Sequence, residues 1–191
     1  MNRRPTPKEQ GTSLLEVLIT MVILAFGLLG IAALQGKTQI GTIESYQRAQ
    51  AVVLLEDMNA RINANRATAA TYVLQAPAGT DDAQPADCNA LGSGAPRDVC
   101  EWSNALKGTS EVRDSAKVGA MTGARGCIDL VQAPDPSAGV CRPGIYLLSV
   151  AWQGLHQTAA SALNCGKNLY GEEGNRRVIS VQVTVGLPSC S

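Results

Sequence analysis

The sequence predicts an α+β protein in which one long N-terminal helix packs on a small antiparallel sheet, with disulfide bonds in the globular part. Three observations support this prediction. No proline interrupts residues 8–76, and the apolar residues of that stretch follow first a continuous and then a helical pattern. A strict alternation of apolar and polar residues marks a strand near the C-terminus. All six cysteines lie beyond residue 87.

The predicted helix extends from about Thr12 to about Asn65. Residues 12–34 form an apolar run with a single charge, Glu16, and such a run is long enough to span a bilayer. After this run, apolar side chains recur at spacings close to three or four, which predicts an amphipathic helix over residues 35–66. We therefore expect 12–34 to lie in a membrane or filament core, and 35–66 to pack on a globular head formed by 67–191.

The sequence of the head predicts several short elements, although the patterns are weaker than in the helix. Residues 76–97 are rich in Pro, Ala, Gly and Asp, which predicts a surface loop. A short helix is expected over 98–107, after the break at Pro96, and no element is predicted over 108–126. Strands are expected over 127–132, 144–152 and 179–185. In the last strand Ile, Val, Val and Val alternate with Ser, Gln and Thr, which predicts one buried and one solvated face.

The cysteines indicate structural disulfides in an oxidising compartment, because an even number of them lies in a small domain behind a membrane-directed N-terminus. Six cysteines allow fifteen pairings. We expect the sequential pairing, Cys88–Cys100, Cys127–Cys141 and Cys165–Cys190. A structural zinc site is not expected, since the chain has no Cys-x-x-Cys pair and only one histidine.

No catalytic motif is present, and we expect neither an enzyme nor a bound cofactor or metal. Asp81, Asp82 and Asp87 lack the regular ligand spacing of a calcium loop. His156 is expected in a solvated loop, and the Arg176-Arg177 pair at a solvated strand edge. Trp102 and Trp152 are expected to serve packing. The chain has 16 basic and 16 acidic residues, so nothing indicates nucleic-acid binding.

The N-terminus fits several topologies. The leader, residues 1–11, carries Arg3, Arg4 and Lys8, so it should stay in the cytoplasm while the rest of the chain is exported. A secretory signal cleaved before Ala33 would leave a secreted domain, but it does not explain Glu16. An uncleaved anchor explains the length of the run and again leaves Glu16 without a reason, because a carboxylate inside a membrane is costly.

A third interpretation accounts for all these features. The basic leader, Gly11, the sequence Thr-Ser-Leu-Leu-Glu-Val and the long apolar run resemble the type III signal of type IV prepilins. The resemblance implies cleavage by prepilin peptidase between Gly11 and Thr12, and N-methylation of Thr12. It also places Glu16 at the fifth mature position, which is the hallmark acid of that family. Thr12 departs from the phenylalanine that the family most often has there.

The resemblance extends to PilV-type minor pilins. The stretch Gly27-Leu-Leu-Gly-Ile-Ala-Ala-Leu-Gln35 is similar to theirs, and Ala151-Trp-Gln-Gly154 is similar to a later strand of that family. It implies a minor pilin that initiates pilus assembly for twitching motility and adhesion. The implied partners are other pilins, prepilin peptidase and the inner-membrane assembly platform. The protein would be a single-pass inner-membrane precursor with a periplasmic head, then part of the pilus. A type II secretion pseudopilin and a membrane-anchored periplasmic binding domain remain alternatives.

Overall fold

The computed structural model describes residues 13–108, 112–113, 116–117 and 121–187. The chain divides into two compact units, Met1–Thr42 and Ile43–Ser191. The described residues of the first unit form a helical segment, whereas those of the second form the sheet, the remaining helices and the core. Together they confirm the predicted α+β class, with a long N-terminal helix, an antiparallel sheet and disulfide bonds.

The first element is α1, Leu14–Ala64, a single helix of 51 residues that confirms the predicted one. At a rise of 1.5 Å per residue its length is about 76 Å. The Ser13 hydroxyl accepts the Leu15 N–H at 3.3 Å, which satisfies one of the open donors of the first turn. Glu16 lies in the first turn and Arg61 in the last, which suits the helix dipole at both ends.

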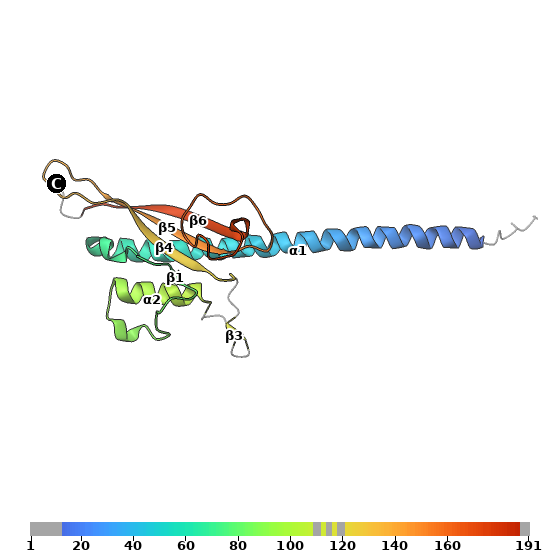
Figure 1. The fold of residues 1–191 in the computed structure, drawn as a ribbon, viewed down its shortest axis with the longest axis horizontal. Coiled ribbons are helices and arrows are strands. Elements are labelled where there is room, and N and C mark those ends of the chain that lie inside the picture. The colour runs from blue at the N-terminus through green and yellow to red at the C-terminus, as the bar shows by residue number, and fades with distance from the viewer. Residues whose placement is uncertain (1–12, 109–111, 114–115, 118–120, 188–191) are drawn as a thin grey trace, which may run out of the picture. The chain divides into compact units, whose positions relative to one another are not determined.

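The head is built on a four-stranded antiparallel sheet in the order β1-β4-β5-β6 (Figure 1). Its strands are β1 Ala78–Gly79, β4 Arg125–Gln132, β5 Gly144–Gln153 and β6 Arg176–Val185. A separate two-stranded ladder joins β2 Val112–Arg113 to β3 Ala116–Lys117. The described residues also form three short 3-10 helices: η1 Arg66–Tyr72, η2 Asn89–Leu91 and η3 Glu173–Asn175.

The core lies where α1, the sheet and α2, Ala95–Leu106, meet. In α1 the buried positions are spaced at helical intervals: Gln47, Ala51, Leu55, Met58 and Ile62. Trp102 of α2 is fully buried and donates its indole N–H to the Leu54 carbonyl at 2.9 Å. A Cβ on Gly126 would lie 2.1 Å from the Trp102 ring, so glycine there makes room for the indole.

Two sequence-based boundaries need correction. The helix α2 begins at Ala95, three residues before the predicted start, because a proline is tolerated in the first turn, where its missing N–H has no intrahelical partner. The region predicted as a loop over 76–97 also contains β1, which pairs with Arg125 and Gly126. In β6 the predicted alternation is confirmed: Ser180, Gln182 and Thr184 are exposed, whereas the intervening residues are buried or half-buried.

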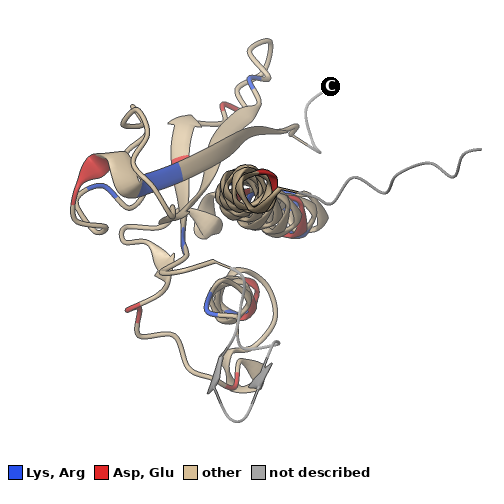
Figure 2. Cartoon of the chain, turned by 90° about the vertical axis from the view of Figure 1, so that its right-hand side faces the viewer, with Lys and Arg blue, Asp and Glu red and all other residues tan. Residues whose placement is uncertain are grey.

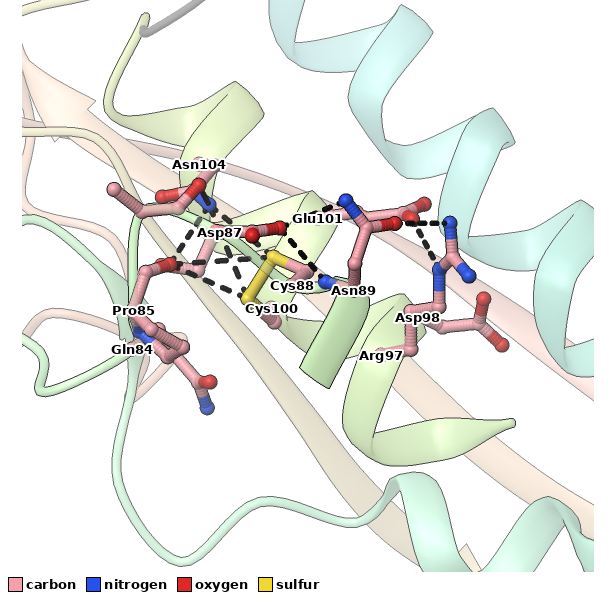
Figure 3. The surroundings of a disulfide bond; sticks show 12 residues. Gln84, Pro85, Asp87, Cys88, Asn89, Arg97, Asp98, Cys100, Glu101 and Asn104 are labelled. Carbon is pink, nitrogen blue, oxygen red and sulfur yellow. Dashed lines mark hydrogen bonds and ion pairs between the residues drawn. A yellow bond between two sulfur atoms is a disulfide. The ribbon is translucent and has the colours of Figure 1, made fainter. Parts of the chain in front are cut away.

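The disulfide pairing agrees with the prediction in one bond and differs in another. Cys88 pairs with Cys100, as expected, with Cα atoms 5.7 Å apart. Figure 3 shows this bond between the 84–89 loop and α2, where the Asn104 amide donates to the Pro85 carbonyl at 2.9 Å. Cys127, however, pairs with Cys165, so the predicted Cys127–Cys141 and Cys165–Cys190 bonds are both wrong.

The geometry of the β4–β5 hairpin explains this difference. Cys127 lies in β4 opposite Ser149, whereas Cys141 follows the far end of the ladder, in the connection closed by the Asp135–Arg142 bridge. Five residues of strand separate Cys127 from the end of β4, about 16 Å, which is more than twice the reach of a disulfide. Cys141 is itself disulfide-bonded, and Cys190 lies outside the described residues.

Arg176 corrects a second expectation, because it lies in the interior rather than at a solvated edge. Its side chain is 1% exposed, and its guanidinium donates to the carbonyls of Ser161, Leu163 and Cys165 at 2.7–3.0 Å. Glu173 neutralises the charge through contacts at 2.6 and 2.8 Å. Arg176 therefore holds the 161–175 connection against the start of β6, in the way a buried charge requires.

Candidate assembly site on the N-terminal helix

The first turns of α1 form the most apolar exposed surface of the described chain. Every residue from Ser13 to Ile43 is exposed, including large side chains such as Leu14 at 84% and Phe26 at 71%. Exposed apolar surface of this extent indicates contact with lipid or with other protein. By length and composition, α1 is the one described helix that could cross a membrane, and it lies near the N-terminus.

Glu16 differs from the other polar side chains of the apolar run, Ser13 and Thr20. The Thr20 hydroxyl donates to the Val17 carbonyl at 2.8 Å, and Ser13 caps the first turn, so both are satisfied within the helix. Within the described residues, no hydrogen bond or ion pair reaches the Glu16 carboxylate. A carboxylate in an apolar environment requires a cation or several donors, so Glu16 needs a partner from outside this segment.

Four glycines lie in the same half of the helix, at positions 27, 30, 36 and 41. The helix continues unbroken through all of them, and a Cβ at any of the four would meet no atom within 4 Å. Nothing in the described chain therefore requires glycine at these positions. Small residues at such positions let another helix approach closely in a bilayer, where packing rather than hydrophobicity drives association.

The remaining predicted site residues are distributed unevenly. Gly11 and Thr12, the predicted cleavage and methylation positions, lie outside the described residues, as does Cys190. Cys88, Cys100, Cys127 and Cys165 form two bonds in the head. Asp81 and Asp82 contact Arg125 and Lys107 respectively, and the described residues contain no group of His, Cys, Asp and Glu arranged to hold a metal.

A polar cluster that the sequence did not indicate fixes the head to α1. Glu44 Oε1 lies 3.1 Å from the Leu155 nitrogen, 3.1 Å from His156 Nδ1 and 3.1 Å from Arg177 Nη2. Arg177 also donates to the carbonyls of His156 and Gly174. We call Glu44, His156 and Arg177 the Glu44 cluster. It joins the helix to both ends of the β5–β6 connection, and His156 is half-exposed there.

Gly154 shows why this cluster depends on a glycine. A Cβ at Gly154 would lie 2.6 Å from the Arg177 guanidinium carbon, a distance that real side chains do not show. Arg177 can therefore reach Glu44 only because position 154 has no side chain. The Gly of the Trp-Gln-Gly sequence was the available signal, but sequence alone does not tell which side chain a glycine admits.

A second network joins α1 to α2. The Arg61 guanidinium contacts Asp57, Asp98 and Glu101 at 2.6–3.1 Å. Tyr72 donates its hydroxyl proton to Asp98. Burial and the neighbouring Asp98 carboxylate raise the pKa of Tyr72 to about 12, so this hydroxyl remains a donor over the physiological range. Figure 2 shows both basic and acidic residues on α2, where this network lies.

Comparison with protein families gives one match, at the N-terminus. Residues 6–32 match the prokaryotic N-terminal methylation motif. The match includes the end of the leader, Gly11, Glu16 and most of the apolar run. It indicates a type IV pilin or a pseudopilin, proteins that are structural rather than catalytic. Comparison with curated proteins and with solved structures gave no match.

The motif changes how the exposed helix is interpreted. Proteins with this motif contact other pilins and are processed by prepilin peptidase, which accounts for the exposed apolar surface of residues 13–43. The motif and the apolar helix together fit a membrane-anchored subunit that becomes part of a filament. The candidate assembly site is thus the segment 13–42, with Glu16 as the one charged residue of its apolar part, residues 13–34.

Proposed function

We propose that this protein is a minor pilin that takes part in initiating assembly of a type IV pilus. The observation that carries the proposal is the helix itself: an exposed apolar surface with one carboxylate, Glu16, in its first turn. The prepilin motif over residues 6–32 supports the class. The similarity of residues 27–35 and 151–154 to PilV-type minor pilins supports the finer assignment.

The proposed mechanism is structural. Prepilin peptidase cleaves between Gly11 and Thr12, and the new α-amino group at Thr12 becomes methylated. In the filament, Glu16 of one subunit pairs with the α-amino group of a neighbour. Each charge is costly alone in an apolar environment, and the pair relieves both, so subunits pack in one register. Residues 12–34 occupy the membrane and then the filament core, residues 35–66 support the head, and residues 67–191 make subunit-specific contacts outside.

Intact mass and N-terminal sequencing of the membrane-extracted protein, with and without prepilin peptidase, test the processing step. A peptidase-dependent start at Thr12 is expected. A start at Met1 would instead indicate an uncleaved anchor, and a start at Ala33 would indicate a secreted domain; either would overturn the proposal.

A type II secretion pseudopilin is the second candidate, because it shares the N-terminal motif and the helix. Deletion of the gene separates the two functions. A minor pilin is expected to be required for surface pili and twitching while type II substrates are still secreted. Loss of secretion with normal piliation would favour the pseudopilin and contradict the minor-pilin assignment.

A further inference from the structure

The two edges of the head sheet differ in how far other segments cover their outer hydrogen-bonding groups. At one edge, the short strand β1 pairs with Arg125 and Gly126 at the start of β4. Further along β4, the Leu74 N–H donates to the Ile128 carbonyl at 3.0 Å. The β4–β5 register also shifts between Leu130 and Gln132. Short partner strands, bulges and local covers of this kind prevent unwanted pairing at a sheet edge.

The other edge, β6, has none of these protections. It pairs with β5 over ten consecutive residues, from Arg176 to Val185, without a register shift. Within the part of the chain that the structure describes, no backbone or side-chain group forms a hydrogen bond to the outer side of residues 178–185. The alternate N–H and C=O groups of this edge are thus unpaired, which is the template that another strand requires.

The composition of β6 reinforces this observation. Residues 178–185 read Val-Ile-Ser-Val-Gln-Val-Thr-Val, with no charge, no proline and no glycine. Natural edge strands usually carry lysine or proline to prevent pairing. Here the basic residues lie only at the start of the strand, as Figure 2 shows, and both are bound within the head, Arg176 to Glu173 and Arg177 to Glu44.

We propose that the outer edge of β6 is a docking site for an extended, uncharged segment of a different polypeptide, which would add a fifth strand to the sheet. Strand addition takes its affinity from main-chain hydrogen bonds and its specificity from alternate side chains. The added strand would continue the pattern of β6, with apolar residues on the side of Val183 and Val185, and neutral polar residues on the side of Gln182 and Thr184.

A second copy of this chain fits the edge less well. Two identical strands pair symmetrically through one shared edge only when they are antiparallel. Figure 1 shows that β6 runs in the same direction as the Ile43–Ala64 part of α1. An antiparallel β6 pair would therefore direct the two helices oppositely, whereas copies anchored in one membrane share a direction. This choice of partner, unlike the open edge itself, rests on the proposed function.

Amide hydrogen exchange of the full chain in detergent micelles tests the edge directly. The probe is an acetylated nine-residue peptide of alternating Val and Thr, and its control carries N-methyl groups on alternate amides. In the free chain we expect fast exchange at every second amide of residues 178–185. The unmodified peptide should slow these amides at least tenfold and the N-methylated peptide should not. Fast exchange that the peptide leaves unchanged, or slow exchange in the free chain, would overturn the proposal.

Charge variants give the matched control. Gln182→Lys, or Ser180→Lys if the first variant is poorly folded, should weaken peptide binding at least tenfold, because a lysine on the exposed face opposes strand addition. Ala160→Lys, at an exposed loop position, should not change it. Equal effects of the two lysines would contradict the edge as the binding site.

Site-specific photo-crosslinking in cells identifies the occupant. A benzoylphenylalanine at position 182 should give an adduct with a different polypeptide that the same group at position 160 does not give. An adduct of two copies of this chain would overturn the choice of partner. None of these three experiments depends on cleavage at Gly11, so failure here and failure of the proposed function are separate results.

Discussion

The two units of this chain obtain their stability in different ways. In the unit Ile43–Ser191, Met58 of α1, Trp102 of α2 and Ile128 of β4 lie in one buried core, and two described disulfides close loops of the same unit. In residues 13–42, every residue is exposed, including the large apolar ones. The head is thus folded by its own contacts, whereas the first part of α1 requires lipid or neighbouring subunits.

Because the two units are stabilised differently, variants in each unit should affect different properties. A change in residues 13–42 should alter membrane and filament behaviour with little effect on the unfolding of the head. A change in the head core should lower its free energy of unfolding without affecting insertion of the helix. A variant in residues 13–42 that destabilises the head, or a variant in the head core that prevents insertion of the helix, would contradict this difference between the units.

The largest effect is expected at Glu16. Glu16→Gln removes the charge that the proposed pairing of subunits requires, so incorporation into filaments should fall at least tenfold, measured by immunoblotting of sheared filaments. The thermal unfolding temperature of the head should stay the same. Thr20→Val is the matched control, one turn away, because the Thr20 hydroxyl is already satisfied by the Val17 carbonyl. Equal loss in both variants would argue against a specific role of the charge.

The next largest effect is expected at Trp102, which is fully buried. Trp102→Ala should lower the free energy of unfolding by about 3–5 kcal/mol, because it removes the largest buried side chain and leaves a cavity. Urea unfolding followed by circular dichroism measures it. Trp102→Phe keeps most of the ring but loses the bond to the Leu54 carbonyl, and it should cost less. Insertion of α1 into membranes should be unaffected by either variant.

Removal of the Cys127–Cys165 bond should lower the free energy of unfolding by about 2–4 kcal/mol, because this bond closes a loop with a sequence separation of 38. The double variant to alanine, compared in urea unfolding with the double variant at Cys88 and Cys100, measures it. The latter bond has a separation of 12 and should cost less. Peptide mapping without reduction should recover both bonds. We also expect a peptide joining Cys141 to Cys190, because Cys141 is bonded and Cys190 is the remaining cysteine.

Asp82 gives a pH dependence. Burial alone would raise its pKa, but hydrogen bonds from Lys107, Ser103 and the backbone of Gly79 and Gln84 outweigh burial and lower the pKa. The folded pKa is below the unfolded one, so this stabilisation is present above pH ~4 and is lost as pH falls through the folded value.

Asp82→Asn should therefore cost about 2 kcal/mol at pH 7, since it weakens several hydrogen bonds to a charged group. The difference between the variant and the original protein should narrow as pH falls below about 4, measured by thermal unfolding across pH. A difference that is constant with pH would contradict the assignment of this stabilisation to the Asp82 charge.

The smallest effect is expected at Glu44, where the two units meet in sequence. Glu44→Gln weakens the Glu44 cluster and should cost about 1 kcal/mol. Its more specific result should be faster amide exchange over residues 43–50, because the first buried residue of α1 is Gln47. Glu56→Gln, an exposed position on the same helix, is the control and should leave exchange there unchanged.

Features with a local cause were predictable. The helix followed from the absence of proline and from apolar periodicity, and β6 followed from its period of two. The Cys88–Cys100 bond joins residues close in sequence. The methylation motif was also local, and the family comparison matches it over residues 6–32. Cleavage after Gly11 and methylation of Thr12 stay predictions. The prediction was wrong about the start of α2, because Pro96 was taken as a break although it lies in the first turn of the helix.

Features that depend on distant partners were not predictable. Arg176 was predicted to be exposed, because its sequence neighbours do not show that the 161–175 connection covers it in the folded chain. The sequence alone left every other cysteine open as a partner of Cys127. Its pairing with Cys165 depends on its position in β4, opposite Ser149, and on the loop that carries Cys165. Glu44 was one of several carboxylates on a helical face, and nothing local indicated that Arg177, 133 residues later, would reach it.

The sequence by itself therefore determined the apolar helix, its single carboxylate and the class of signal that precedes it, because each depends on neighbouring residues along the chain. Only the tertiary structure decided the Cys127–Cys165 pairing, the burial of Arg176, the Glu44 cluster and the open edge of β6. Those features arise where strands and loops far apart in sequence come within a few ångströms, and short-range patterns carry no record of such distances.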